Sequence, residues 1–313
     1  MRRDEVLRWV RAVTVAGIAL AAGVLAGLSG RGADASVVAT FDLGLGARAV
    51  GMGGAFVGLA DDGASLFYNT AGLAWLSNSS VLSSYESLPG AAAYGQVSVA
   101  LPHFGAGVTL FDFGEVPATD EYGNIIGSFS YRDYAFVAGV GATAADLPFV
   151  PKNVWAERVA LGLSAKFLAV STLNPGSGRG FALDVSLLMR ADASGFVSGY
   201  GLGVVAENAF GIPIRYGSGH EEDWRRKLKM GMSVDLRDRV VLAFDVTTDK
   251  TFCAGAEWTP IPLFSLRSGV EYDGLWRWSY GIGTRFRSFT FDCAVVTHPY
   301  MDSRFRGSFC VAW

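Results

Sequence analysis

Apolar and polar residues alternate along much of the carboxyl-terminal half of this chain. Between Trp276 and Arg287 the even positions are aromatic residues, isoleucine or threonine, and the odd positions are glycine, serine or arginine. A period of two with one apolar face is typical of a β-strand, whose successive side chains point to opposite faces. This stretch therefore predicts a strand with one apolar and one polar face.

The same pattern recurs, strictly or in weaker form, from Ser79 to the end of the chain. Fourteen stretches follow it: 79–86, 93–101, 104–113, 131–145, 159–171, 181–190, 200–208, 228–236, 240–248, 252–259, 263–273, 276–287, 289–297 and 304–313. An even number of antiparallel strands is typical of barrels in the bacterial outer membrane. A soluble β-sandwich gives the same alternation, so the pattern alone does not separate the two folds.

No helical membrane span is predicted beyond the amino-terminal region, although 50% of the residues are hydrophobic. The longest uncharged stretch, Ser87–Phe111, is interrupted by Pro89, Pro102 and several glycines, which excludes a continuous helix. Every backbone polar group must be paired inside a bilayer, so a chain that spans it without helices must form a closed β-barrel. We therefore expect an all-β, 14-stranded antiparallel outer-membrane barrel.

The connections between the expected strands sort into two ends. The long loops 114–130 and 209–223 fall at one end, and short turns such as Leu101–Phe104 and Arg237–Arg239 fall at the other. Outer-membrane barrels have long external loops and short periplasmic turns. Residues 146–157 do not fit, because this long, proline-containing connection falls on the periplasmic side, where it leaves room for a further strand.

The first 35 residues are organised like a secretory signal peptide. Four arginines precede an uncharged run from Ala12 to Gly30, and Ala33-Asp34-Ala35 supplies a cleavage site. A single membrane anchor is the alternative, since the run is just long enough to span, but its alanine and glycine content favours cleavage. We expect residues 1–35 to be removed and the mature chain to begin at Ser36 in the cell outer membrane.

Charge excludes one class of partner. Residues 1–35 hold five arginines and three acidic residues, so the 26 basic and 29 acidic residues of the whole chain become 21 and 26, a net charge of −5. Such a chain lacks the basic surface that nucleic-acid binding requires. In a barrel, most of these charges would face the lumen, where confined charges must be paired or hydrated. We therefore expect a network of cross-strand ion pairs inside the barrel.

A glycine-rich segment, Gly44–Leu76, precedes the first expected strand. It places eight glycines among small apolar residues, which indicates backbone packed closely against something else. Gly44-x-Gly46-x-x-Ala49 imitates a dinucleotide-binding fingerprint, but the fingerprint requires a preceding hydrophobic strand and a following helix in a βαβ unit. That context is absent here, so we favour a segment enclosed in a shell.

The run GARAVGMGGAFVGLADDGASLFYNTAGLA, about 30 residues from Gly46 to Ala74, resembles the amino-terminal signature of the PorV/PorQ (UPF0164) outer-membrane proteins, relatives of the FadL-type barrels. In that family the segment is a plug or hatch in the barrel mouth. The resemblance implies a plug over residues 36–78 and a barrel over 79–313. Thr70 stands where the family usually has proline, which puts the rigidity of that turn in doubt.

The final strand ends on an aromatic residue. Phe309, Val311 and Trp313 share the apolar face of this stretch, which resembles the terminal signal read by the outer-membrane barrel assembly machinery. An ordinary edge strand that happens to come last is the alternative.

The sequence contains none of the usual motifs for catalysis, metal binding or cofactor binding. There is no G-x-S-x-G elbow, P-loop or H-E-x-x-H motif. The three cysteines lie in expected strands without a C-x-x-C spacing: by parity Cys253 and Cys310 point inward and Cys293 toward lipid. Asp61 and Asp62 resemble a catalytic or cation-binding pair, but at the start of a short helix an N-cap is the simpler interpretation.

The function expected from the resemblance is FadL-like transport of hydrophobic small molecules, such as long-chain fatty acids, across the outer membrane. The expected ligand and plug contacts are Phe56, Phe67, Tyr68, Asn69, Thr70, Phe129 and Ile214. A PorV-like accessory protein that receives secreted cargo is the alternative, and an outer-membrane enzyme is a third. The expected partners are outer-membrane lipid, the barrel assembly machinery, and either a hydrophobic molecule or a cargo protein.

Overall fold

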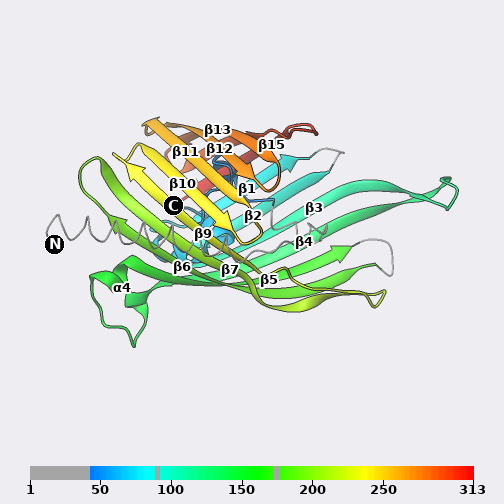
Figure 1. The fold of residues 1–313 in the computed structure, drawn as a ribbon, viewed down its shortest axis with the longest axis horizontal. Helices are drawn as coiled ribbons and strands as arrows, with labels where there is room; N and C mark the ends of the chain where they lie inside the picture. Colours follow the sequence, from blue (N-terminus) through cyan, green and yellow to red (C-terminus); the bar gives the residue numbers. More distant parts are fainter. Residues whose placement is uncertain (1–42, 89–91, 172–175) are drawn as a thin grey trace.

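The computed structural model describes residues 43–88, 92–171 and 176–313. They form one antiparallel sheet wound into a barrel, shown in Figure 1. The strands are β1 (Ser80–Ser87), β2 (Ala93–Leu101), β3 (Phe104–Thr119), β4 (Ile125–Thr143), β5 (Val159–Ser171), β6 (Gly178–Asp192), β7 (Val197–Tyr216), β8 (Glu221–Glu222), β9 (Lys227–Leu236), β10 (Val240–Thr247), β11 (Phe252–Ile261), β12 (Phe264–Tyr272), β13 (Trp276–Phe286), β14 (Phe289–Val296) and β15 (Arg304–Ala312).

The sheet closes on itself because β6 pairs with β7. Of its fifteen strands, β8 has two residues and is attached at the edge of β7, which leaves fourteen in the closed ring. The first and last strands of the chain also pair, and beside them Ser79 and Trp313 exchange two backbone hydrogen bonds of 2.9 and 3.0 Å. The predicted 14-stranded antiparallel barrel is confirmed.

Side chains alternate between the two surfaces of the wall as the sequence pattern predicts. In β13, Trp278, Tyr280 and Ile282 are exposed on the outer surface, whereas Ser279 and Gly281 are buried on the inner one. Chain ends of outer-membrane barrels are periplasmic, so we call the end of the barrel that carries the start of β1 and the end of β15 the periplasmic end. The opposite end is the external end.

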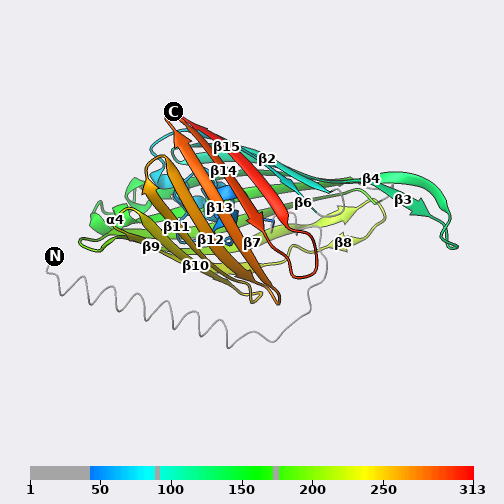
Figure 2. The same ribbon diagram turned by 90° about the horizontal axis from the view of Figure 1, so that it is seen from above.

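The stretches interpreted as long external loops lie at the external end as expected, but they are largely strand, so their interpretation as loops is wrong. β3 and β4 continue past the barrel as a two-stranded arm (residues 113–131), which is prominent in Figures 1 and 2. Their ladder shifts register between Asp112 and Glu115 and then runs on to the Thr119–Ile125 pair. Pairing between the two strands satisfies the backbone groups on their facing edges, and the groups on the outer edges are left to water.

The connection over residues 146–157 holds no additional strand. It contains a 3-10 turn, η4 (Ala144–Asp146), and a short helix, α4 (Val154–Arg158). Asn153 caps α4 by accepting hydrogen bonds from the backbone of Trp155 and Ala156, at 3.1 and 3.0 Å. A capping side chain at this position favours helix over strand.

The remaining short elements precede the barrel. They are α2 (Ala47–Gly51), α3 (Ser65–Tyr68) and the 3-10 helix η2 (Thr70–Trp75). In the described part of the chain no helix combines the length and the apolar character needed to cross a membrane. Residues 1–42 lie outside the described residues, so cleavage before Ser36 stays a prediction.

Candidate functional site

The segment Gly44–Leu76, which we call the lumen segment, lies inside the ring of strands. Figure 2 shows it in blue, surrounded by the wall. Its apolar side chains are almost all buried, and Phe56, Tyr68 and Met52 form a core with Tyr94 of β2 and other wall residues. The structure therefore places this segment in the lumen.

Glycines on the inner surface of the wall make room for the lumen segment. A Cβ on Gly201 of β7 would lie 2.1 Å from the carbonyl oxygen of Gly58. For a whole girdle of inward glycines, an added Cβ would come within 3.2 Å of the lumen segment: Gly105, Gly107, Gly139, Gly141, Gly162, Gly201, Gly203, Gly231, Gly255, Gly269 and Gly281. At several of these positions, such as Gly141, Gly162, Gly203 and Gly269, backbone of the wall meets backbone of the lumen segment directly.

Asp245 of β10 anchors the middle of the lumen segment. Its Oδ2 accepts hydrogen bonds from the backbone nitrogens of Phe56 and Val57, at 2.7 and 2.8 Å. The hydroxyl of Ser233 in β9 donates to the carbonyl oxygen of Gly58, at 2.9 Å. Phe56, Val57 and Gly58 lie outside helices and strands, so their backbone groups need other hydrogen-bond partners. The contacts with Asp245 and Ser233 supply these partners and hold the segment in one position.

Arg48 ties α2 to the wall and to the turn before α3. It makes a two-pronged contact with Glu257 of β11, with both distances at 2.9 Å, and also binds Asp61 at 2.6 Å and Asp62 at 2.8 Å. Burial raises the pKa of Asp62, and the charge of Arg48 opposes this effect. Asp62 also accepts a hydrogen bond from Ala64 N at 2.8 Å. The aspartates therefore act as structural partners of Arg48, and Asp62 caps the turn before α3 instead of α3 itself.

The inner surface also carries the expected ion-pair network. The cross-strand pairs of the wall include Lys166–Asp184, Lys229–Glu207, Arg267–Glu257, Arg267–Asp292, Arg277–Glu271, Arg304–Glu86 and Arg306–Glu86. Arg306 additionally donates to the carbonyl oxygens of Gly44 and Leu43, at 2.5 and 3.0 Å. Buried charges need such partners, because an unpaired one is costly to desolvate.

An apolar cluster occupies the external end of the lumen on the β4–β7 side. Its buried members are Ala135, Leu168, Val170, Ala182, Ile214 and Trp224, and Tyr131 and Tyr216 pack against them. We call this set the mouth cluster. Trp224 enters from the stretch before β9 and donates its indole N–H to the carbonyl oxygen of Ile212 at 2.8 Å.

Two glycines create the space that the Trp224 ring fills. A Cβ on Gly211 would lie 2.9 Å from the ring, and one on Gly180 would lie 3.1 Å from it. Sequence reasoning missed Trp224, because it lies outside the periodic stretches. A large aromatic residue just past an external loop was the one available signal.

The mouth cluster is joined to the lumen segment by aromatic contacts. Tyr131 packs on the mouth cluster, and its ring centroid lies 6.4 Å from that of Phe111 in an edge-on arrangement. Phe111 in turn packs against the core that contains Phe56 and Tyr68. An apolar track therefore runs from the external mouth to the lumen segment, within a wall that carries buried ion pairs elsewhere.

The residues expected to contact ligand divide into two groups. Phe56, Phe67 and Tyr68 belong to the packed interior of the lumen segment, where the Phe56 and Tyr68 rings lie 5.2 Å apart. Ile214 is fully buried in the mouth cluster, and Phe129 lies half-buried on the arm opposite Val116.

Asn69 and Thr70 have local structural contacts. The Asn69 amide donates to the carbonyl oxygens of Val57 and Leu187, at 2.9 and 3.1 Å, and its oxygen accepts from Ala71 N at 3.2 Å. The Thr70 hydroxyl donates to Leu66 O at 3.2 Å. These bonds shape the turn between α3 and η2.

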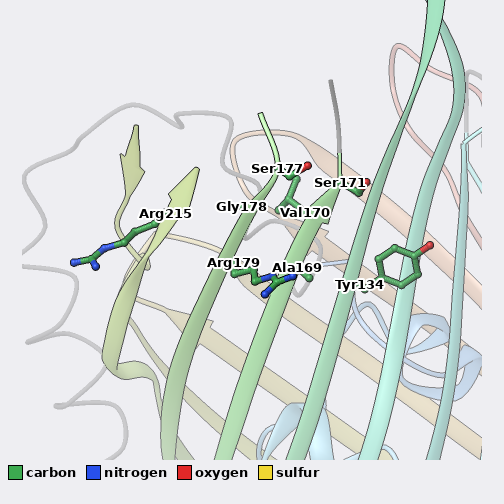
Figure 3. A pocket seen from close by; sticks show the side chains of 8 residues that line it. All are labelled: Tyr134, Ala169, Val170, Ser171, Ser177, Gly178, Arg179 and Arg215. Atoms are coloured by element: carbon green, nitrogen blue, oxygen red, sulfur yellow. The ribbon is translucent and has the colours of Figure 1, made fainter. Parts of the chain in front are cut away.

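A pocket of about 600 Å³ lies at the external end of the outer wall, shown in Figure 3. Its lining residues are Tyr134, Ala169, Val170, Ser171, Ser177, Gly178, Arg179 and Arg215. Val170 also belongs to the mouth cluster. The pocket and the mouth cluster therefore lie on opposite sides of the wall formed by β5 and β6. Ser171, Ser177, Arg179 and Arg215 contribute polar groups to the lining of the pocket.

The aromatic end of the chain lies on the outer surface. Phe309 packs against Phe291 and Phe289 of β14, with ring centroids 4.6 and 5.9 Å apart. Val311 is half-buried and Trp313 is exposed. These residues therefore share the outward face, as the alternation predicts.

Among the described residues, no group of three or more histidine, cysteine or acidic side chains is arranged to hold a metal ion. All three cysteines are free: Cys253 is buried, Cys310 is half-buried and Cys293 is exposed on the outer surface. These positions agree with the parity of the strands.

No family model matches the sequence, and no curated protein matches it. Solved structures do resemble it. The toluene transporter TodX of P. putida has a TM-score of 0.53 and 11% identity, over 86% of this chain and 97% of that chain. A Pseudomonas aeruginosa FadL homologue has a TM-score of 0.52 and 11% identity, over 84% and 97% of the two chains.

A TodX mutant described as a monoaromatic hydrocarbon channel matches with a TM-score of 0.50 and 12% identity, over 86% of this chain and 97% of that chain. At such identity the likeness shows the fold alone. That fold is an antiparallel β-barrel of the kind seen in FadL-type outer-membrane proteins.

Proposed function

We propose that this protein is a FadL-like transport protein that admits hydrophobic small molecules, with long-chain fatty acids as the first candidates. The observation that carries the proposal is the apolar track from Ile214 and Trp224 through Tyr131 and Phe111 to the lumen segment. Ligand sites are mostly apolar and enclosed. A porin-type aqueous channel has a polar lumen instead.

The neighbours' names support this proposal, since they describe a toluene transporter and a FadL homologue. The resemblance of Gly46–Ala74 to the PorV/PorQ signature supports membership of the same broad group. In this proposal Trp224 occupies the ligand's place in the closed state, and Phe129 and Ile214 receive the ligand first. Phe56, Phe67 and Tyr68 then form the apolar surface that meets it deeper in the barrel.

Photocrosslinking in membranes tests the proposed track. A photoreactive long-chain fatty acid should label the mouth cluster and Phe129, and Ile214→Gln should reduce both labelling and transfer into proteoliposomes. Ile212→Gln is the matched control, because Ile212 lies two residues away and is exposed. Label confined to the outer surface, or equal loss from both variants, would contradict the proposal.

The lumen segment is proposed to act as a plug. The lumen of a fourteen-stranded barrel is intermediate in width between those of small, side-chain-filled barrels and open sixteen-stranded porins. Removal of the segment should therefore leave a water-filled channel. Deletion of residues 44–72 should therefore raise ionic conductance in planar bilayers. A large, steady conductance of the intact protein that the deletion leaves unchanged would contradict this role.

A second candidate function is that of a PorV-like accessory protein for secretion, favoured by the arm. Its tip exposes Tyr122, Ile125 and Ile126, at 82%, 73% and 69% of their surfaces. Exposed apolar patches often mark protein-binding sites. Replacing Tyr122, Ile125 and Ile126 by serine leaves Phe129 in place, so it should abolish cargo capture but preserve fatty-acid transfer if the accessory function is correct.

A further inference from the structure

The connection between β4 and β5 is a feature of the periplasmic end that transport does not explain. It spans residues 144–158, whereas the neighbouring connections at this end are tight turns. Three of its large apolar side chains are exposed: Phe149 at 79%, Val154 at 61% and Trp155 at 45%. So much exposed apolar surface in one short stretch indicates a non-aqueous neighbour.

The connection is held in a defined shape at both ends. At its start, the Asp146 carboxylate accepts hydrogen bonds from the Thr143 hydroxyl at 2.7 Å and the Thr143 backbone at 2.8 Å. These hydrogen bonds lower the pKa of Asp146, so the capping interaction persists at neutral pH. At its end, the Glu157 carbonyl oxygen accepts from the indole N–H of Trp75 at 3.2 Å.

The orientation of α4 follows from these contacts. Ala156 is the buried residue of the helix, on the side held by Trp75. Val154 lies two residues away, on nearly the opposite face of the helix. In Figure 1 the connection leaves the lower left of the barrel and extends beyond the outer side of the β4–β7 wall.

The exposed apolar surface continues that of the barrel wall. α4 ends at Arg158 and β5 begins at Val159 with no intervening residue. Leu161 and Leu163 of β5 and Val140 of β4 face outward near this end. At a rise of about 3.3 Å per residue, Leu161 lies only about 10 Å beyond the helix.

We propose that residues 147–155 form an interfacial anchor that inserts among the phospholipids of the periplasmic leaflet. Aromatic residues such as Trp155 and Phe149 favour the interface between membrane and water. Lys152 lies between Phe149 and Val154, and Arg158 follows Trp155 by three residues; both side chains suit contact with lipid phosphates. The phospholipid is the occupant because the surface is continuous with the lipid-facing wall. The inference rests on the barrel fold and does not depend on what the barrel transports.

Site-directed fluorescence in lipid nanodiscs tests the anchor. In a Cys293→Ser background, an environment-sensitive probe would be attached at Phe149→Cys, with Phe167→Cys as a lipid-facing reference and Tyr122→Cys as a water-exposed one. Brominated phospholipids should quench the probe at position 149 to an extent close to that at 167, while leaving 122 unquenched. Val154→Cys provides a second site should the first variant fail to assemble.

Two results would overturn the proposal. One is a probe at positions 149 and 154 that matches the water-exposed reference in emission and quenching. The other is protection of these positions by an added envelope protein with no quenching by lipid, which would assign the surface to a protein partner. Heat-modifiable migration on gels confirms that each labelled barrel is folded.

Discussion

A Cβ atom on Gly162 of β5 would lie 2.3 Å from the backbone nitrogen of Ala71. The same nitrogen donates a hydrogen bond to the Ser186 hydroxyl of β6 at 3.1 Å. Wall and lumen segment therefore meet at this point with no side chain of Gly162 between them. Such an approach fixes the depth of the segment in the barrel, because neither backbone can move toward the other.

Gly162→Val should displace the lumen segment. The added side chain overlaps Ala71 and the backbone of Thr70, and overpacking of this kind costs about 1–3 kcal/mol. We expect a lower midpoint of thermal unfolding and a higher ionic conductance than in the native protein. Gly95→Val is the control, because nothing lies within 4 Å of a Cβ at that position. Equal behaviour of the two variants would refute the close fit.

Asp245→Ala should loosen the middle of the lumen segment. The substitution removes the acceptor for the backbone nitrogens of Phe56 and Val57, and each buried donor left unpaired costs about 1–3 kcal/mol. Hydrogen exchange at these two amides should become faster. Asp245→Asn retains a side-chain oxygen and should restore most of the protection. Unchanged exchange in the alanine variant would show that the anchor is not Asp245.

Thr70→Pro should be tolerated and should stiffen the turn before β1. Thr70 begins η2, and the preceding Asn69 has φ −159° and ψ 96°, an extended conformation that suits a residue before proline. Proline at a compatible site adds about 0.4–1 kcal/mol of stability. The stabilisation from the hydrogen bond that the Thr70 hydroxyl donates to Leu66 O must be subtracted from this gain. Denaturant unfolding measures the gain, and reduced ionic leak should accompany it. Marked destabilisation would show that the hydroxyl matters more than the turn.

Trp313→Asp should impair insertion of the barrel into the membrane. The Trp313 side chain is 64% exposed on the outer surface, and Trp313→Phe, which keeps an aromatic ring, should insert normally. Since Trp313 follows the end of β15, the energetic cost of a carboxylate is at most about 1 kcal/mol, so a severe defect would reflect lost recognition by the assembly machinery. Fractionation followed by heat-modifiable gel migration reports the outcome.

Local pattern was sufficient for the barrel wall. Along each strand, successive side chains point alternately to the outer and the inner surface of the barrel. An even or odd position, such as that of Trp278 or Arg277, therefore determines which surface a residue occupies without knowledge of the neighbouring strand. Confined charges need partners, and this requirement predicted ion pairing inside the barrel before any pair was known. The arm was misread because a two-stranded hairpin outside the bilayer has two wet faces and needs no apolar one.

The sequence by itself determined the number of strands, their inward and outward faces, the free cysteines on the expected sides, and the unusual composition of Gly44–Leu76. Only the tertiary structure decided what that segment touches. The girdle glycines, Asp245 and Trp224 are ordinary residues in their own stretches. Their roles arise from contacts across the lumen between residues far apart in the chain. The alternation of apolar and polar residues within one strand does not predict which wall residue contacts which residue of the lumen segment.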